Sequence, residues 1–307
     1  MSDIILHHYP TSPFAEKVRI ALGIKGLAWK SVIIPIIMPK PDLMPLTGGY
    51  RKTPVMQIGA DIYCDSQCIL RELERRFPQP SLYTGTDAGT ANALAFWHDR
   101  NLFMPAVGMA FGSRSMENLP AGFFEDRARM SGRPLDLERL RAARPLFIDQ
   151  LRTQWVWFDQ MLADGRAFLQ GQHPTLVDCA VYNPCWFIRR NCGVVAPFSE
   201  FPRLLAWTER MEQIGHGQPT PLDSKDALAI ARAASPQATP QIDVHEPLGR
   251  TPGVKLEISP DDTGKDPVVG ELLSISTQEV VIRREDPLVG EVAVHFPRTG
   301  FVIKAPG

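Results

Sequence analysis

The sequence predicts a multidomain protein with an α/β domain over residues 1–80, an all-helical domain over residues 88–216 and a small all-β module over residues 245–307. Three observations carry this prediction. Short apolar runs and helical stretches alternate in βαβ and then ββα order along the first domain. Beyond it, apolar residues recur at helical spacing. Near the carboxyl end they alternate at strand spacing between turn-forming residues.

The α/β domain carries clear local signals. A helix is expected to begin after Ser12, because Ser is a favoured N-cap and Pro13 suits the first helical position. Gly59 lies between two short apolar runs, which predicts a hairpin. The expected elements are strands over residues 3–8, 29–34, 55–58 and 62–64, a helix over residues 13–23, and a helix from Asp65 and Ser66 to residue 77.

The second domain is expected to be helical throughout. Turn-forming residues dominate positions 79–90, which we interpret as an interdomain linker. Thr175 and Asp178 have the spacing of a capping box, with Asp in place of the usual Glu, and Gly193 marks the end of that helix. The expected helices cover residues 93–111, 146–162, 175–192 and 204–214.

The carboxyl-terminal module is predicted to form a small sheet or barrel. Proline and polar residues precede it, around a short alanine-rich segment. A module of roughly 60 residues is near the size at which a separate core becomes marginal, so we expect it to pack on its neighbours. Its expected strands cover residues 254–258, 268–275, 280–283, 292–296 and 301–304.

Composition excludes several classes of protein. The net charge of −1 gives no bulk electrostatic attraction to nucleic acid or to an anionic membrane. We see neither a signal peptide nor an apolar stretch long enough to span a bilayer. Five cysteines in a long chain make no disulfide framework, and the histidines show no metal-ligand spacing. We therefore expect a cytoplasmic protein without a metal, nucleic-acid or membrane partner.

Four short motifs follow one another along the chain: Ser12-Pro13-Phe14-Ala15-Glu16, Thr53-Pro54-Val55, Asp65-Ser66, and the capping box of Thr175 and Asp178. In this order they resemble the glutathione transferase family over residues 1 to about 215. The resemblance implies a thioredoxin-like first domain, an all-helical second domain, glutathione as co-substrate and a homodimer. It also implies a small apolar electrophile as second substrate. It says nothing about the β-rich module.

The start of the first helix is the expected place of chemistry. Unsatisfied N–H groups and the helix dipole attract anions, and a hydroxyl there suits a thiolate. We interpret Ser12 as the donor to the glutathione thiol, with simple helix capping as the alternative. Tyr9, at the end of the first strand, and Thr11 are rival donors. Position 12 is not a cysteine and the chain has no Cys-x-x-Cys, which argues against thiol–disulfide exchange.

The other motifs are expected to hold the rest of glutathione. The resemblance implies a cis peptide bond before Pro54, with the Val55 backbone pairing with the cysteinyl unit. It places the γ-glutamyl carboxylate on Ser66 and its amino group on Asp65. Gln67 is expected to assist. Lys52 or Arg51 is expected to pair with the glycyl carboxylate. Plain helix caps and solvated basic side chains are the structural alternatives.

The second substrate is expected to lie between the two domains, under a lid formed by residues 112–134. Many of the apolar side chains proposed for its wall could equally belong to the helical core. The candidates are Phe14, Trp97, Phe103, Met104 and Phe111.

These expectations favour an enzyme that adds glutathione to an apolar electrophile. The same site could instead serve a glutathione-dependent isomerase, dehalogenase or ether-cleaving lyase. A non-catalytic glutathione-binding scaffold protein is the alternative from another class. In a further possibility, the β-rich module replaces the usual dimer contact.

Overall fold

The computed structural model describes residues 3–113, 119–193 and 196–306. The amino-terminal half of the sheet and its helices comprise β1 (Ile5–His8), α1 (Pro13–Ile24), β2 (Ala28–Ile33), α2 (Met44–Thr47), β3 (Val55–Ile58), β4 (Asp61–Cys64) and α3 (Ser66–Arg76). The helical domain comprises α4 (Ala88–Asn101), α5 (Phe103–Phe111), α6 (Phe123–Ser131), α7 (Leu137–Met161), α8 (Leu176–Cys192), α9 (Ala196–Ser199) and α10 (Pro202–Ile214). After it come β5 (Gln218–Pro221), α11 (Ser224–Ala233), β6 (Lys255–Pro260), β7 (Val268–Ile275), β8 (Glu279–Asp286), β9 (Gly290–Pro297) and β10 (Phe301–Lys304).

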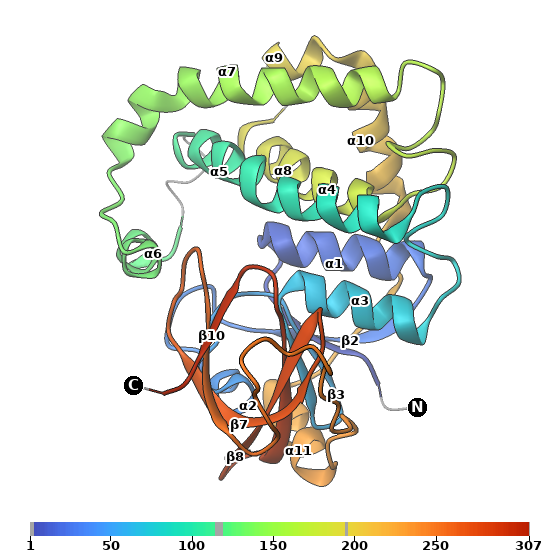
Figure 1. Cartoon of the computed structure of the whole chain (residues 1–307). Coiled ribbons are helices and arrows are strands. Elements are labelled where there is room, and N and C mark those ends of the chain that lie inside the picture. The colour runs from blue at the N-terminus through green and yellow to red at the C-terminus, as the bar shows by residue number, and fades with distance from the viewer. Residues whose placement is uncertain (1–2, 114–118, 194–195, 307) are drawn as a thin grey trace.

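The helical domain lies on top of a mixed sheet, with α1 and α3 between the two (Figure 1). Helix α1 begins as the sequence predicts: the Ser12 side chain accepts a hydrogen bond from the Ala15 N–H, and Pro13 follows at the first position. The hairpin of β3 and β4 and the start of α3 also agree with the prediction. Local capping signals in the sequence therefore predicted where the helices beside the cleft described below begin.

Within the described part of the chain, the strands form one ten-stranded sheet in the order β10-β6-β7-β8-β9-β4-β3-β1-β2-β5. Strands β6 to β9 form an antiparallel meander, and β10 returns to pair with β6. The meander joins the amino-terminal strands where β9 pairs in parallel with β4. An uncovered edge at β4 would leave backbone N–H and C=O groups unpaired, and β9 satisfies them. The β-rich module thus continues the amino-terminal sheet.

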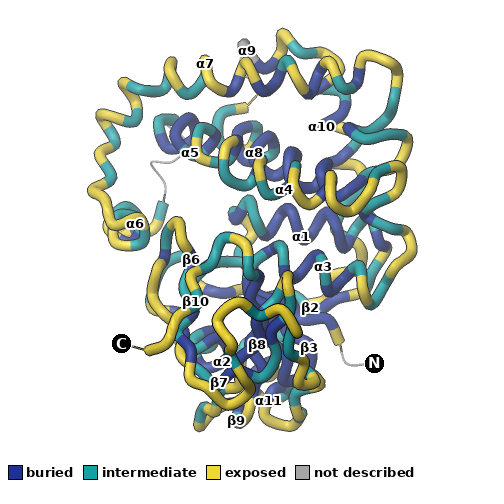
Figure 2. Tube along the Cα trace, in the orientation of Figure 1, coloured by how far each residue is buried: buried dark blue, intermediate teal, exposed yellow. Residues whose placement is uncertain are grey.

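Two large cores lie on opposite sides of the sheet (Figure 2). The first joins α1 and α3 to the helical domain, where Trp155, Phe158 and Trp207 are fully buried. The second joins the carboxyl-terminal strands to α2, α11 and the other sheet face. Because the second core takes residues from both ends of the chain, the β-rich strands share their apolar burial with their neighbours, as expected for so small a unit.

Helices α6 and α11 were not among the expected helices, and α7 begins at Leu137 and not at residue 146. Two further differences involve proline. The single helix expected over residues 93–111 is two helices, α4 and α5, with Leu102 between them. Pro105 accounts for this break, because it has no N–H to donate and its ring clashes with the carbonyl of Asn101. The second difference is β5, which carries Pro219 and Pro221 and still pairs with β2. Proline is tolerated there because β5 is an edge strand.

The capping box behaves as predicted. The Asp178 carboxylate is fully buried and accepts hydrogen bonds from the backbone N–H groups of Leu169 and Thr175 and from Nε1 of Trp207. Asp178 is therefore a structural residue. Among the described residues, no helix combines the length and the apolar character needed to cross a membrane.

Candidate functional site

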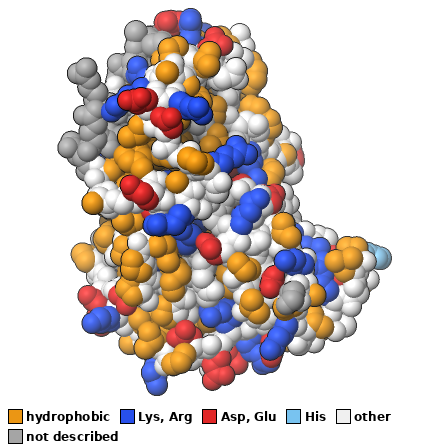
Figure 3. Space-filling view, turned by 90° about the vertical axis from the view of Figure 1, so that its left-hand side faces the viewer, with side chains coloured by type: hydrophobic (Ala, Val, Ile, Leu, Met, Phe, Trp, Pro, Cys, Tyr) orange, Lys and Arg blue, Asp and Glu red, His pale blue; other side chains and the backbone are white. Residues whose placement is uncertain are grey.

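A cleft of about 920 Å³ lies where the amino-terminal domain, the helical domain and two loops of the carboxyl-terminal strands meet. Figure 3 shows the molecule from the side on which α6 lies in Figure 1, where hydrophobic side chains gather beside basic and acidic ones. Most of the residues singled out from the sequence line this cleft. They are Tyr9, Ser12, Phe14, Lys52, Pro54, Asp65, Ser66, Gln67, Phe103, Met104 and Phe111.

Ser12 stands at the amino end of α1 and lines the cleft. It is 2 % exposed, and its Oγ atom accepts from the Ala15 N–H at 3.2 Å. A hydroxyl has one proton to donate and two lone pairs, so capping leaves its O–H free to donate, either to the neighbouring Tyr9 hydroxyl or to a ligand in the cleft. The cap and the proposed thiol donor are therefore compatible roles for one side chain.

Tyr9 and Thr11 line the cleft close to Ser12. Burial raises the pKa of Tyr9, while the nearby Arg127 and a hydrogen bond with Ser12 act in the opposite direction. A raised pKa keeps the phenol protonated at neutral pH. Tyr9 thus stays a possible hydrogen-bond donor beside Ser12.

The start of α3 forms a second polar part of the cleft. Asp65 caps the helix through a hydrogen bond from the Gln67 N–H, and its φ of 75° lies in the region that L-residues rarely adopt. Strain of this kind persists where the surrounding structure enforces it, often at ligand sites. Ser66 Oγ accepts from Lys17 Nζ at 3.4 Å, and Lys17 also forms an ion pair of 2.6 Å with Asp99 on α4.

Lys17 and Asp99 were not predicted from the sequence. Lys17 is almost completely buried, and the Asp99 side chain is 11 % exposed. The ion pair joins α1 to α4, so it fixes one wall of the cleft against the other. The only sequence signal was a lysine and an aspartate in unrelated helices, which no local pattern links.

Three cationic side chains lie near the loop before Pro54, and two of them have carboxylate partners. Lys52 Nζ is 2.5 Å from Asp262 Oδ1, and Arg51 forms an ion pair of 2.6 Å with Asp126. Lys40, which the sequence analysis did not select, is 3 % exposed and has no ion pair among the described residues.

Lys40 Nζ donates to the Arg51 carbonyl and to Thr53 Oγ1. Burial lowers its pKa to about 7, with Arg127 and Arg51 acting in the same direction. A buried ammonium group that lines a cleft and forms no ion pair among the described residues suits an anionic ligand.

The apolar wall of the cleft faces Ser12 from the helical domain. The Phe14 and Phe103 rings are 4.6 Å apart, so α1 and α5 meet there through aromatic contact. Phe111 is nearly buried and packs edge-on against Phe123 of α6, while Met104 is 58 % exposed.

Two of the selected residues do not line the cleft. Trp97 is 38 % exposed and lies 6.1 Å from the Trp157 ring. Helical periodicity explains this, since the neighbouring Phe96 takes the face toward the cleft. Val55 is fully buried in the second core and pairs with β1 and β4, although the Thr53–Pro54 peptide bond is cis as expected.

Helix α6 lies over one side of the cleft, as part of the lid expected over residues 112–134. Asp126, which is 1 % exposed, accepts from the Met38 N–H and forms ion pairs with Arg51 and Arg127. These contacts hold α6 to the amino-terminal domain. Residues 114–118 of the expected lid lie outside the described residues.

The carboxyl-terminal strands also contribute to the cleft, which the sequence analysis did not anticipate. Asp262 and Thr263 come from the loop between β6 and β7, and Gly300 and Phe301 from the start of β10. Asp262, for example, contacts Lys52, which lies more than 200 positions earlier in the chain. No local signal marks them, and the family resemblance did not extend to this part of the chain.

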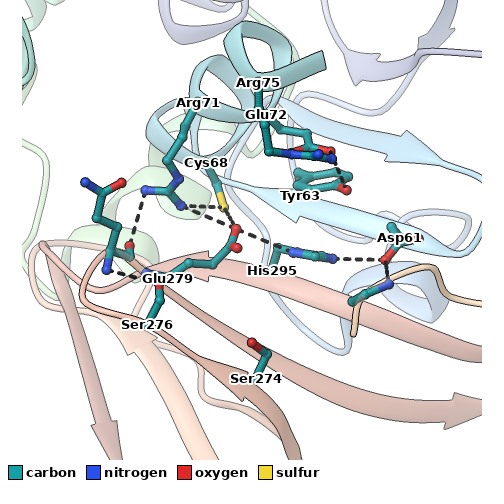
Figure 4. Close-up of polar contacts among 12 residues, drawn as sticks. Asp61, Tyr63, Cys68, Arg71, Glu72, Arg75, Ser274, Ser276, Glu279 and His295 are labelled. Carbon is teal, nitrogen blue, oxygen red and sulfur yellow. Dashed lines mark hydrogen bonds and ion pairs between the residues drawn. The ribbon is translucent and has the colours of Figure 1, made fainter. Parts of the chain in front are cut away.

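A second polar cluster lies outside the residues that line the cleft, where β4 meets β9 (Figure 4). His295 Nε2 is 3.1 Å from Asp61 Oδ1, and its Nδ1 is 3.4 Å from Glu279 Oε1. Cys68 donates to the same Glu279 oxygen at 3.0 Å, and Arg71 forms an ion pair with it. The cluster ties α3 and β4 to the carboxyl-terminal strands.

Burial raises the pKa of the Cys64 and Cys68 thiols well above the ordinary value. Both are therefore protonated and poor nucleophiles at neutral pH. Over residues 3–113, 119–193 and 196–306, no group of His, Cys, Asp or Glu side chains is arranged to hold a metal ion.

Comparisons with known proteins agree with this arrangement. Residues 6–81 match the family model described as the glutathione S-transferase amino-terminal domain, and residues 115–217 match a domain of unknown function. A GST-like protein from Pseudomonas syringae is similar over 100 % of both chains, with 39 % identity and a TM-score of 0.79. No curated protein gives a match.

Two further solved structures share the fold. A glutathione S-transferase from Rhodospirillum rubrum is 22 % identical, with a TM-score of 0.55 over 68 % of this chain and 87 % of its own. FzlA from C. crescentus is 24 % identical, with a TM-score of 0.52 over 68 % and 88 %. The Pseudomonas protein is thus similar over the carboxyl-terminal strands as well, whereas these two leave about a third of the chain unmatched.

Proposed function

The chain belongs to the glutathione S-transferase-like proteins, and we propose that it is an enzyme that binds glutathione, stabilises its thiolate and transfers it to an apolar electrophile. The observation that carries this proposal is Ser12, whose hydroxyl caps α1 while it lines the cleft. Helix N–H groups and one hydroxyl donor at the same point suit a sulfur anion.

Thiolate stabilisation sets the size of the proposed effect. A free thiol with a pKa near 8.5 is only a few per cent ionised at neutral pH. Lowering that pKa by about two units raises the thiolate fraction roughly 25-fold. Ser12 would donate its hydroxyl proton to the sulfur, with Tyr9 as the rival donor. Larger accelerations come from holding the electrophile next to the sulfur.

The two ends of glutathione would bind to different cations. Ser66, with Lys17 behind it, supports the γ-glutamyl carboxylate, and Asp65 and Gln67 lie beside it. At the glycyl end, Lys40 is the best-placed cation, because Lys52 and Arg51 already have carboxylate partners. The backbone beside Pro54 would then face the cysteinyl unit.

The second substrate would lie against Phe14, Phe103, Met104 and Phe111. Aromatic and thioether side chains stabilise apolar groups by burial and dispersion, so we propose a small apolar electrophile. The bond formed is between the glutathione sulfur and the electrophilic carbon. The leaving group, or the electron pair of an activated double bond, takes the displaced negative charge.

A glutathione-dependent isomerase, dehalogenase or lyase would use the same site, because each also begins with a thiolate. A non-catalytic scaffold protein would need only the glutathione contacts. Cytoplasmic location and a homodimer are further proposals from the family. Light scattering of the full chain tests the homodimer: a monomeric mass would favour replacement of the dimer contact by the carboxyl-terminal strands.

The proposal is tested by turnover. Glutathione is mixed with one aryl halide, one alkyl halide, one epoxide and one activated alkene, with wild type and Ser12→Ala. We expect conjugate with at least one electrophile, and a fall of roughly 25-fold in Ser12→Ala at neutral pH, because the variant loses the thiolate fraction that the hydroxyl supplies. Glutathione binding without turnover of any of them would favour the scaffold protein, and absence of binding would overturn both.

A further inference from the structure

The loop between β6 and β7 crosses the cleft from the carboxyl-terminal strands. Two adjacent carboxylates hold it to opposite walls. Asp262 contacts Lys52, which belongs to the amino-terminal domain, while Asp261 Oδ1 is 2.6 Å from Arg100 Nη2 on α4. One loop therefore links both domains through ion pairs with two cations that line the cleft.

Two backbone contacts complete the attachment. The Gly264 N–H donates to the Met130 carbonyl of α6 at 2.8 Å, and the Asp261 N–H donates to the Gly300 carbonyl at 3.0 Å. Gly300 has a φ of 87°, and a Cβ atom there would lie 2.6 Å from Arg100 Nη2. Glycine at this position thus leaves room for the guanidinium that reaches Asp261.

The ion pair at Lys52 is accessible to competing anions. The Lys52 side chain is 18 % exposed and the Asp262 side chain 39 %. Burial would raise the pKa of Asp262, but Lys52 and Arg100 lower it, so the group is a carboxylate at neutral pH. Ion pairs at this level of exposure contribute little free energy, so another carboxylate can replace Asp262.

We propose that Asp262 is a specificity-determining residue that competes with a ligand carboxylate for Lys52. The inference rests on the proposed function, in which that carboxylate is the glycyl end of glutathione. Because Lys52 exchanges one carboxylate for another, it adds little to glutathione affinity. The unpaired Lys40 then supplies most of the discrimination for a charged glycyl end. Asp262 thereby weakens the preference of the cleft for a second negative charge.

The test compares two ligands, glutathione and its glycyl amide, which lacks that carboxylate. Calorimetric titration at low salt uses wild type, Asp262→Asn and Asp266→Asn. Asp266 is a matched control, since it is in the same loop, is exposed, and has no ion pair within the described part of the chain. We expect Asp262→Asn to bind glutathione about 2- to 5-fold more tightly, with the amide and the control unchanged.

Four further measurements sharpen the result. The gain should disappear in the double variant Lys52→Met with Asp262→Asn, and it should shrink at high salt, because exposed charges are screened. Lys52→Met alone should change glutathione affinity less than twofold. Hydrogen exchange should become faster over residues 260–267 when glutathione binds, as the loop loses its contact with Lys52.

Distinct outcomes overturn the inference. Equal glutathione affinity in Asp262→Asn and wild type, an equal gain for both ligands, or a large loss in Lys52→Met would each contradict competition at Lys52. Slower exchange over residues 260–267 on binding would contradict displacement of the loop. If wild type binds neither ligand, the proposed function is overturned, and this inference with it. That result differs from the outcomes above, in which wild type still binds glutathione.

Discussion

His295 of β9 and Asp61 of β4 are in contact at 3.1 Å across the seam that makes one sheet from two parts of the chain. The Asp61 carboxylate also accepts from the N–H groups of Gln237 and Ala238, in the segment that leads to the carboxyl-terminal strands. One buried carboxylate thus holds three separate segments together.

This contact predicts a pH dependence. Burial lowers the pKa of His295, but Asp61 and Glu279 outweigh burial and raise it above 6.5. A raised folded-state pKa means that the stabilisation is fully present below pH 6.5 and is lost as the pH rises through the folded-state value. We expect His295→Gln to lose roughly 3 kcal/mol of unfolding free energy at pH 6, and less at each higher pH.

Urea denaturation of both proteins between pH 6 and 9 measures this difference. His245→Gln is the matched control, because His245 is exposed, and it should follow the wild-type curve. A constant difference between His295→Gln and wild type over this range would show that the imidazolium charge does not stabilise the seam.

A second prediction concerns Asp178. Replacing it with alanine leaves three buried N–H donors without their acceptor, namely those of Leu169, Thr175 and Trp207. We expect Asp178→Ala to lower the unfolding free energy by roughly 3 kcal/mol or more. Asp164→Ala, at an exposed ion pair, should leave it nearly unchanged. Similar losses in the two variants in chemical denaturation would be inconsistent with a structural role for Asp178.

The lowered pKa of Lys40 predicts that ligand binding depends on pH. Its pKa of about 7 in the free protein means that the ammonium is lost as the pH rises above neutrality. A ligand carboxylate favours the charged form, so binding should weaken with rising pH. We expect the affinity for S-methylglutathione to fall between pH 7 and 8.5, by up to about tenfold per pH unit.

The methyl group on sulfur removes thiol titration from this measurement. Lys40→Met should bind the same ligand more weakly at pH 6.5 and should show a flat profile up to pH 8.5. A falling profile that persists in Lys40→Met would assign the titrating group elsewhere.

The apolar wall predicts how S-alkyl chains bind. Phe103 contacts Phe14 inside the cleft, whereas Trp97 lies outside it. Wild type should bind S-hexylglutathione more tightly than S-methylglutathione, because the longer chain buries apolar surface. Phe103→Ala should lose most of this preference, and Trp97→Ala should keep it. Titrations that show the reverse order would place the apolar site elsewhere.

Local signals in the sequence predicted much of the fold. Ser12 with Pro13, and Thr175 with Asp178, satisfy backbone groups within a few residues, so their patterns are visible in a short window. The pairing of β9 with β4 depends on residues more than 200 positions apart. No short window contains both partners of such a contact.

The residues of the candidate site also fall into those that a local pattern predicted and those that no local pattern could predict. Helix starts at Ser12 and Ser66 are local, and both line the cleft. The neutralisation of Lys52 by Asp262 is not local, and it turns an apparent ligand group into half of an ion pair. Lys40 gave no motif either, because its importance comes from its burial and from the lack of an ion pair to it among the described residues.

The central claim is that the cleft turns bound glutathione into a thiolate through Ser12. Ultraviolet thiolate absorbance of bound glutathione, followed against pH for wild type and Ser12→Ala, tests it most directly, with Tyr9→Phe as the rival variant. The account predicts a bound thiol that titrates about two pH units below free glutathione in wild type and returns to its free value in Ser12→Ala. A bound thiol with an unshifted pKa in wild type, or a shift that survives in Ser12→Ala, would contradict it.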